Sequence, residues 1–287
     1  MSATLQHLSA TVHHLAHTIG TRSYREVEKL NRTADYIEAT FRSYDLVAER
    51  QAFTYQGNTY YNVITSVRGA GSAPGGDLVI GAHYDTVAGT PGADDNASGV
   101  AGLLELARLA AAEPLRRTVQ FAAFTLEEPP AFMTSRMGSY VYAGSLREKE
   151  RDVYGMISLE MLGYYTDARG SQLYPLPLLQ WRYPDRGNFI AFVGNTTSRP
   201  FTLEVKSALN AVSPFPVESL NASPLIPGIS FSDHCSFWRC GYPAFMITDT
   251  AFFRNPHYHG PGDTPETLDY ERMSRLVEAL SRALRML

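Results

Sequence analysis

Short apolar segments that each end in a histidine or a carboxylate recur between residues 78 and 160, and they restrict the fold of this chain more than any other feature. They are Leu78–Ala82 before His83, Thr118–Thr125 before Glu127 and Glu128, and Gly155–Leu159 before Glu160. Helical patterns lie between them, at Gly99–Ala112 and near Gly138–Glu148. Strands that alternate with helices predict βαβ units, and the carboxyl ends of such strands build ligand crevices. The sequence therefore predicts an α/β fold with polar groups gathered at its strand ends.

The remaining segments extend this α/β pattern over the whole chain. We expect helices in the first 45 residues, a β-rich segment at Gln51–Val67, strands at Phe189–Val193 and Tyr242–Thr248, a surface excursion at Tyr165–Asn188 and a final amphipathic helix at Leu268–Leu287. No internal repeat or low-complexity tract divides the sequence. We therefore predict a single domain, 1–287, in which the N-terminal helices of about 1–45 pack on a central mixed sheet.

Composition limits the kinds of binding partner that we expect and indicates the cellular compartment. The formal net charge of the 287 residues is −4 and the basic residues are scattered, so we expect neither a nucleic-acid nor a membrane partner. No apolar run is long enough to span a bilayer and the first residues lack the layout of a signal peptide, which predicts a cytoplasmic protein. Cys235 and Cys240 lie close together, as reduced thiols or as one local disulfide.

The polar residues at the strand ends are of the types that bind zinc. His83 and Asp85 stand two apart at the end of an extended segment, so their side chains point the same way, and Asp95 follows on a Gly-rich loop. Glu127 and Glu128 are adjacent and must face different ways. One of them can bind a metal while the other accepts a proton, which is the division of labour that hydrolytic zinc sites require.

Two later segments add candidates of the same types. Glu160 ends a strand, and Tyr258 and His259 lie in a loop rich in Pro and Gly. A lone Glu or His at such a position is usually structural or solvated. His234 is open to a structural role or a role in substrate binding, and Arg254 to a salt bridge or a clamp for a substrate carboxylate.

Taken in order, these motifs resemble the bacterial co-catalytic di-zinc aminopeptidases from about residue 76 to the C-terminus. The motifs are His83-Tyr84-Asp85, Gly92-Ala93-Asp94-Asp95-Asn96-Ala97-Ser98-Gly99, Glu127-Glu128, Glu160 and Tyr258-His259-Gly260-Pro261-Gly262-Asp263-Thr264. The same family includes glutaminyl cyclases and glutamate carboxypeptidases. The resemblance implies a three-layer α/β/α sandwich with a central mixed, mostly parallel twisted sheet.

The resemblance also implies a role for each site residue. Asp95 bridges two zinc ions; His83 and Glu160 complete the shell of one ion, and Glu128 and His259 that of the other. Glu127 is the general base, Asp85 orients the first histidine, and Tyr258 donates its phenol to the oxyanion. Asp94 is then left to cap the following helix or to make a loop hydrogen bond.

Function follows as an expectation from that ligand set. We expect a zinc-dependent exopeptidase, an aminopeptidase that acts on peptides or amino-acid derivatives through a water between two zinc ions. Glu160 stands where the best-known aminopeptidases carry Asp, and Pro129-Pro130 follows the Glu pair, so substrate choice is open. The alternatives are a glutaminyl-cyclase-like acyltransferase with a single zinc, a metallocarboxypeptidase or dipeptidase, and a non-catalytic binding module. The oligomeric state is not predicted.

Overall fold

One eight-stranded sheet runs through the protein. The structure is a computed structural model that describes residues 2–71 and 73–287. The strands are β1 (Ala48–Tyr55), β2 (Asn58–Val67), β3 (Asp77–His83), β4 (Val119–Phe124), β5 (Val153–Glu160), β6 (Ile190–Asn195), β7 (Val217–Ala222) and β8 (Ala244–Thr248). They lie in the order β1-β2-β4-β3-β5-β8-β6-β7. The four strands β4, β3, β5 and β8 are mutually parallel, whereas β1–β2, β2–β4 and β6–β8 pair antiparallel.

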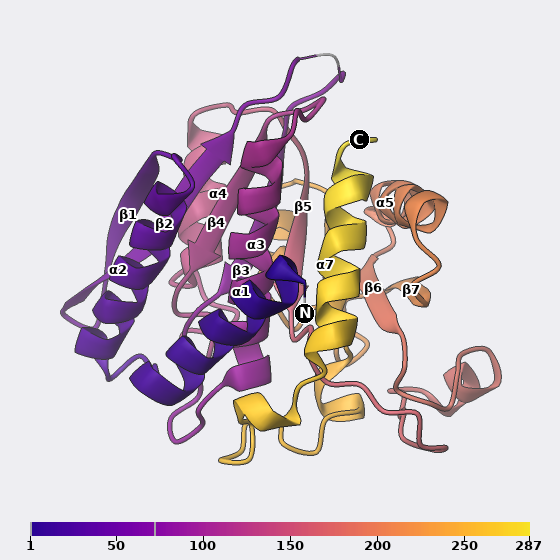
Figure 1. Cartoon of the computed structure of the whole chain (residues 1–287). Coiled ribbons are helices and arrows are strands. Elements are labelled where there is room, and N and C mark those ends of the chain that lie inside the picture. Colours follow the sequence, from indigo (N-terminus) through magenta and orange to yellow (C-terminus); the bar gives the residue numbers. More distant parts are fainter. Residues whose placement is uncertain (1, 72) are drawn as a thin grey trace.

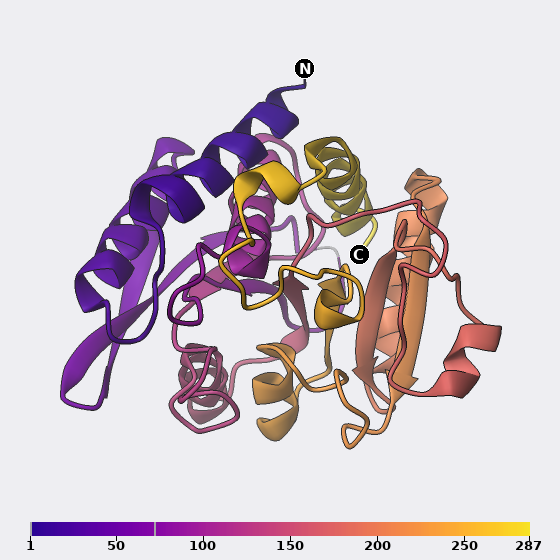
Figure 2. The same ribbon diagram turned by 90° about the horizontal axis from the view of Figure 1, so that it is seen from below.

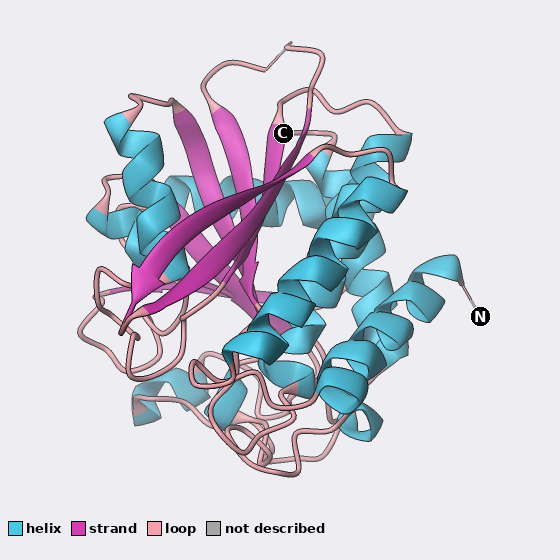
Figure 3. Ribbon diagram, turned by 90° about the vertical axis from the view of Figure 1, so that its left-hand side faces the viewer, coloured by secondary structure: helices cyan, strands magenta, loops and turns pink. Residues whose placement is uncertain are grey.

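Helices cover both faces of the sheet, which makes three layers (Figure 1, Figure 3). They are α1 (Ala3–His13), α2 (Val27–Ser43), α3 (Gly99–Ala112), α4 (Gly138–Glu148), α5 (Arg199–Val212), α6 (His234–Arg239) and α7 (Tyr270–Leu284). Helices α1, α2, α3, α5 and α7 contact one another on one face, and α4 packs with α6 on the other. The predicted α/β/α sandwich with a mixed, mostly parallel sheet is confirmed.

Residue patterns explain why these layers form. Strand β3 is buried along nearly its whole length because helices cover both of its faces, so it reads as a continuous apolar run. Helix α7 buries Met273, Leu276, Val277 and Leu280, a helical spacing that lays one apolar stripe against the sheet side. Its first turn is capped by Asp269, whose side chain accepts from the Arg272 main-chain N–H at 2.9 Å.

Most predicted elements are present in the structure, but the sequence analysis did not predict the helices and the strand between residues 199 and 239. The predicted Gly99–Ala112 and Gly138–Glu148 helices match α3 and α4 in their bounds, and the β-rich segment forms the hairpin β1–β2. Helix α2 packs on β2 and β1, whereas α1 lies against α3 and α7. The excursion Tyr165–Asn188 contains the short 3-10 turn Pro177–Trp181. The elements α5, β7 and α6 were not predicted.

The sheet topology brings distant loops to one place. Because β3, β4, β5 and β8 are parallel, their carboxyl ends lie at the same edge of the sheet. Figure 2 looks at this edge, where the loops that follow these strands gather. No helix of the described residues is long and apolar enough to cross a membrane. Cys235 and Cys240 are both free and buried.

Candidate metal centre

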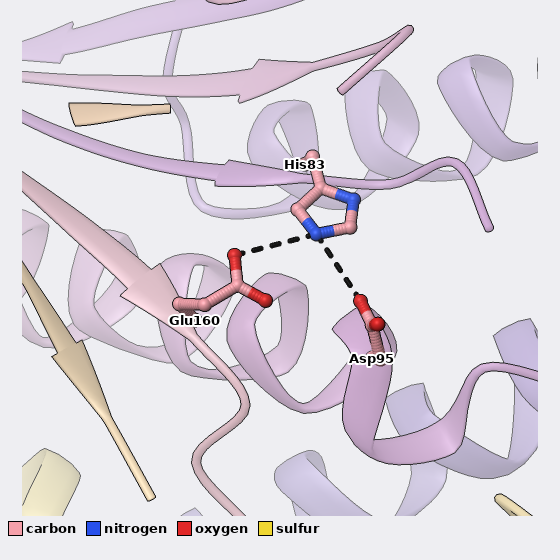
Figure 4. Close-up of side chains that lie close together, drawn as sticks. All are labelled: His83, Asp95 and Glu160. Carbon is pink, nitrogen blue, oxygen red and sulfur yellow. Dashed lines mark ion pairs between the residues drawn. The ribbon is translucent and has the colours of Figure 1, made fainter. Parts of the chain in front are cut away.

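Three of the predicted ligands meet where β3 and β5 end. His83 is the last residue of β3, Glu160 is the last residue of β5, and Asp95 lies in the short helical turn Ala93–Ser98 that leads into α3 (Figure 4). The His83 Nε2 atom is 3.3 Å from Asp95 Oδ1 and 3.4 Å from Glu160 Oε2. The His83 Nδ1 atom faces the Asp85 carbonyl at 3.2 Å, so an Nδ1 proton donated there leaves the Nε2 lone pair free for a metal.

A second group of donors shares Asp95 with the first. The His259 Nε2 atom is 3.1 Å from Asp95 Oδ2 and 3.3 Å from Glu128 Oε1. Within each of the two groups, one ligand atom per residue lies within 4.8 Å of the others. Within the described part of the chain, Asp95 is therefore the residue that both groups share, with one oxygen turned to each.

The two groups differ in access to solvent. The side chains of His83, Asp95 and Glu160 are 1%, 4% and 9% exposed, whereas that of His259 is 30% exposed. The difference follows from the backbone, because His83 and Glu160 end central strands and His259 lies in the surface loop between β8 and α7. We call the first set the buried group and the second the open group.

The electrostatics of the cluster favour a bound cation. Burial lowers the pKa of His83, but Glu160, Glu127, Asp85 and Asp95 outweigh it and raise that pKa well above its ordinary value. Burial, with the nearby carboxylate of Asp95, raises the pKa of Glu128 to about 7. Anionic groups are thus crowded beyond what the two imidazoles neutralise.

Unused oxygen atoms give an independent test of whether a metal fits. Among the described residues, Asp95 Oδ1 and Glu128 Oε1 are buried without a hydrogen-bond partner, although an imidazole nitrogen lies 3.3 Å from each. Buried carboxylate oxygens rarely stay unsatisfied. Imidazole nitrogen and carboxylate oxygen are the donors that zinc takes in hydrolytic sites. The residues present therefore fit zinc ions.

The loop that carries Asp95 is held from two sides. Asp263 accepts from the main-chain N–H groups of Asp94 and Asp95, at 2.8 and 3.1 Å. The Asn96 side chain donates to the Leu159 carbonyl at 2.9 Å and ties the loop to β5. A side chain at Gly99 would place its Cβ 2.5 Å from that same carbonyl oxygen, so only glycine permits the close approach.

Asp94 takes the loop-hydrogen-bond role and not that of a helix cap. Its carboxylate accepts from the Gly163 N–H at 2.9 Å and from the Asn255 side chain at 2.8 Å. It belongs to neither ligand group. This geometry supports the choice of Asp95 over Asp94 as the bridging residue.

Glu127 lies beside the ligands but in neither group. Its Oε2 atom is 4.0 Å from His83 Nε2. Burial raises the pKa of Glu127 well above its ordinary value, and the carboxylates of Glu128 and Glu160 add to the rise against the opposing effect of His83. A carboxyl group in this position, beside the ligands and outside both donor groups, is a candidate for proton transfer.

Asp85 has a wider structural task than the sequence analysis expected. Its Oδ1 atom is 3.6 Å from His83 Nδ1, farther than its own carbonyl oxygen. The carboxylate accepts instead from the main-chain N–H groups of Glu127 and Glu128, at 3.1 and 3.0 Å. Asp85 therefore fixes the turn that directs the two glutamates.

Tyr258 lies against the open group. Its ring stacks on His259, with centroids 3.8 Å apart and planes 19° apart, and it lines the same pocket as Glu160. Burial and the neighbouring carboxylates raise the pKa of this phenol above its ordinary value, so the group stays protonated and able to donate. Its position is compatible with the predicted oxyanion role.

Three residues of the centre received no role in the sequence analysis: Ser232, Asp233 and Asp263, of which Asp263 was quoted only as part of the motif Tyr258–Thr264. The Ser232 hydroxyl donates to Glu160 Oε2 at 2.7 Å and so orients that ligand. Asp233 is fully buried, and burial raises its pKa to about 7. The printed sequence holds a usable signal for two of them, since Ser232-Asp233-His234 was considered only for its histidine.

His234 and Arg254 have structural contacts. The His234 Nε2 atom lies 2.8 Å from the Ile229 carbonyl, and burial lowers the pKa of this imidazole to about 4. Arg254 is buried and donates to the Gln172 side chain and to the Tyr164 carbonyl. It holds the main chain at the start of the excursion Tyr165–Asn188 and does not line the pocket next to Glu160.

Comparisons with known proteins agree with this geometry. The model of peptidase family M28 matches residues 62–284. An uncharacterized protein of Escherichia coli, YfbL, is 46% identical over 286 residues, which cover 97% of this chain and 87% of that protein. A probable leucine aminopeptidase of Trichophyton verrucosum is 26% identical over 74% of this chain. The match spans about half of that enzyme, 53% of its length.

Solved structures share the fold at low sequence identity. A zinc aminopeptidase from Bacillus subtilis superimposes with a TM-score of 0.75 at 16% identity, over 97% of this chain and 94% of the other. A glutaminyl cyclase from Porphyromonas gingivalis gives a TM-score of 0.71 at 19% identity, over 99% of both chains. These two likenesses establish the fold and leave the reaction to be argued from the site.

Proposed function

The chain belongs to peptidase family M28, and from that premise we propose that it is a zinc-dependent aminopeptidase that removes N-terminal residues from peptides. The observation that carries the proposal is the position of Asp95. Its two carboxylate oxygens face two separate sets of donors, His83 with Glu160 and Glu128 with His259. A shared carboxylate between two donor sets is what a pair of metal ions requires.

Each residue of the centre has a place in this proposal. His83, Asp95 and Glu160 would hold one zinc ion, and Asp95, Glu128 and His259 the other. When bound, zinc supplies Lewis acidity at the scissile carbonyl and lowers the pKa of water. We expect two ions per chain.

Proton transfer falls to Glu127. Its carboxylate is free of both donor groups, lies at the edge of the buried group and has a pKa well above its ordinary value. It accepts the proton of the attacking water and returns that proton to the nitrogen of the departing peptide. Asp85 holds the Glu127 main chain in place, and the Tyr258 phenol donates to the oxygen on which negative charge develops.

A single change tests the mechanism. Glu127→Gln keeps the shape of the side chain and removes the proton acceptor, so turnover of an aminoacyl peptide should fall on the order of 100-fold or more. Zinc content should stay the same, because Glu127 is in neither donor group. Mass spectrometry of metals measures the zinc content, and peptide hydrolysis measures the turnover. Unchanged turnover would exclude Glu127 as the base.

The cyclase alternative makes a different prediction for the same protein. A glutaminyl-cyclase-like enzyme would hold one zinc and convert N-terminal Gln to pyroglutamate, while an aminopeptidase releases the first residue. The five-donor set favours two ions and thus the aminopeptidase. The carboxypeptidase alternative depended on a clamp by Arg254, whose Nε and Nη1 atoms donate to Gln172 and Tyr164 and which does not line the pocket beside Glu160.

A further inference from the structure

A pocket opens beside Glu160, on the face of the sheet that carries α4 and α6. The space between its lining residues is about 770 Å³ when the open solvent at its mouth is included. Its floor is formed by β8, β6 and β7. The excursion of residues 172–183 and the segment 227–231 form its walls, and in Figure 2 the excursion passes beside these strands.

Strand register places a second carboxylate at the far end of this floor. Glu160 pairs with Thr248, Thr248 with Ala191 and Ala191 with Glu218, so the four residues form one row across β5, β8, β6 and β7. All four line the pocket. With neighbouring strands about 4.8 Å apart, the Cα atoms of Glu160 and Glu218 are roughly 14 Å apart.

The surface between the two carboxylates is apolar. It is formed by Val193, Met246, Tyr174, Tyr183, Phe252 and Phe253, among others. Of the described residues that line the pocket, only Glu160 and Glu218 are charged, and none is a lysine, arginine or histidine. Burial raises the pKa of the Tyr174 phenol and the Glu218 carboxylate adds to the rise, while Arg254, outside the lining, opposes it.

We propose that this pocket receives the side chain of the substrate's N-terminal residue and that Glu218 selects a long basic side chain, that of lysine or arginine. The inference rests on the proposed aminopeptidase function. Lysine and arginine each have an apolar stem and a terminal cation, which matches an apolar channel that ends in a carboxylate. A guanidinium also has aromatic faces on which to stack, at Tyr174 and Tyr183.

Other side chains fit the pocket less well. A leucine would leave the Glu218 end unfilled, and a glutamate would bring a third carboxylate into a pocket that already has two. Norleucine is the informative comparison, because it has the four-carbon stem of lysine without the ammonium group. Any preference for lysine over norleucine measures the contribution of the terminal charge alone.

The test compares hydrolysis of Lys-Ala and norleucyl-Ala by the zinc-loaded protein and its variants. For the wild type we expect kcat/KM to favour Lys-Ala by about tenfold or more, as a charge-assisted hydrogen bond would give. Glu218→Gln should reduce that ratio to about one, and Glu218→Leu should reverse it in favour of norleucine. Glu148→Gln, at an exposed position on α4, removes the same charge away from the pocket and should leave the ratio unchanged.

Binding gives a second readout that does not need turnover. In the Glu127→Gln background, calorimetric affinity should be higher for Lys-Ala than for norleucyl-Ala, and the difference should disappear when Glu218→Gln is added. A wild type that cleaves norleucyl-Ala as well as Lys-Ala, or a ratio untouched by Glu218→Gln, overturns the role of Glu218 alone. If the zinc-loaded protein cleaves no peptide with a free N-terminus, the proposed function itself fails.

Discussion

Two buried histidines of this protein, His83 and His234, lie in surroundings that shift the pKa of the imidazole in opposite directions. Both side chains are almost completely buried. Around His83, four carboxylates raise the imidazole pKa, while around His234 burial lowers it to about 4. The contrast shows that burial alone does not make the strand ends unusual. Their excess of carboxylates does, and a cation bound among them would offset that negative charge.

The largest effect should come from the residue that both donor groups share. Asp95→Asn weakens a donor of each group, so zinc should fall from about two ions per chain to about none after dialysis, as expected for loss of a ligand. His83→Ala and His259→Ala should each leave about one, because each removes a donor from a single group. Metal mass spectrometry of the three variants measures this. An Asp95→Asn protein with both ions would break the account.

A smaller effect on zinc binding is expected from Ser232, which is not a metal ligand itself but contacts the ligand Glu160. Ser232→Ala removes the hydroxyl that orients Glu160, so zinc affinity of the buried group should fall about 10- to 100-fold. The measurement is chelator competition in a His259→Ala background, which isolates the buried group. Ser230→Ala, whose hydroxyl is turned to the Pro224 carbonyl, is the matched control. Equal affinities in the two serine variants would refute the positioning role.

The remaining prediction concerns folding stability and not metal binding, and it involves His234, whose charged form is disfavoured by burial. In the unfolded chain this imidazole has its ordinary pKa of 6.5, and in the folded chain a pKa of about 4. Between these values only the unfolded chain binds the proton. The free energy of unfolding should therefore fall as pH drops from 6.5 to 4, by at most ~1.4 kcal/mol per pH unit from this residue, and its contribution is complete above pH 6.5.

Denaturant unfolding at several pH values checks that sign. His234→Phe keeps an aromatic ring beside Trp238 but cannot bind a proton, so its stability should depend less steeply on pH than that of the wild type. His13→Gln, exposed on α1, serves as the control for loss of a histidine. An identical pH dependence of wild type and His234→Phe would mean that His234 does not titrate as its burial requires.

Sequence patterns predicted the elements that have strong periodicity and clear boundaries. Helix α3 begins at Gly99 and α7 repeats apolar residues at helical spacing, and both signals are local. Helix α5 had a similar signal at Phe201, Val205 and Leu209 that was overlooked. Strand β7 could not be recognised, because it is a partly exposed edge strand without an apolar alternation.

The candidate ligands were found through ordered motifs, but the groups around them were not. Asp263 reaches the main chain of Asp94 and Asp95, and Ser232 reaches Glu160, across long stretches of sequence. Glu218 enters the pocket only because β7 pairs with β6 in a particular register. These roles depend on which loops and strands become neighbours. No local pattern contains that information.

The most direct test of the account is the anomalous scattering of crystals of the zinc-loaded protein at the zinc edge. The account predicts two peaks, about 3.5 to 4 Å apart, on either side of the Asp95 carboxylate. One peak should lie next to His83 and Glu160, and the other next to Glu128 and His259. A single peak, or peaks away from these five residues, would contradict it.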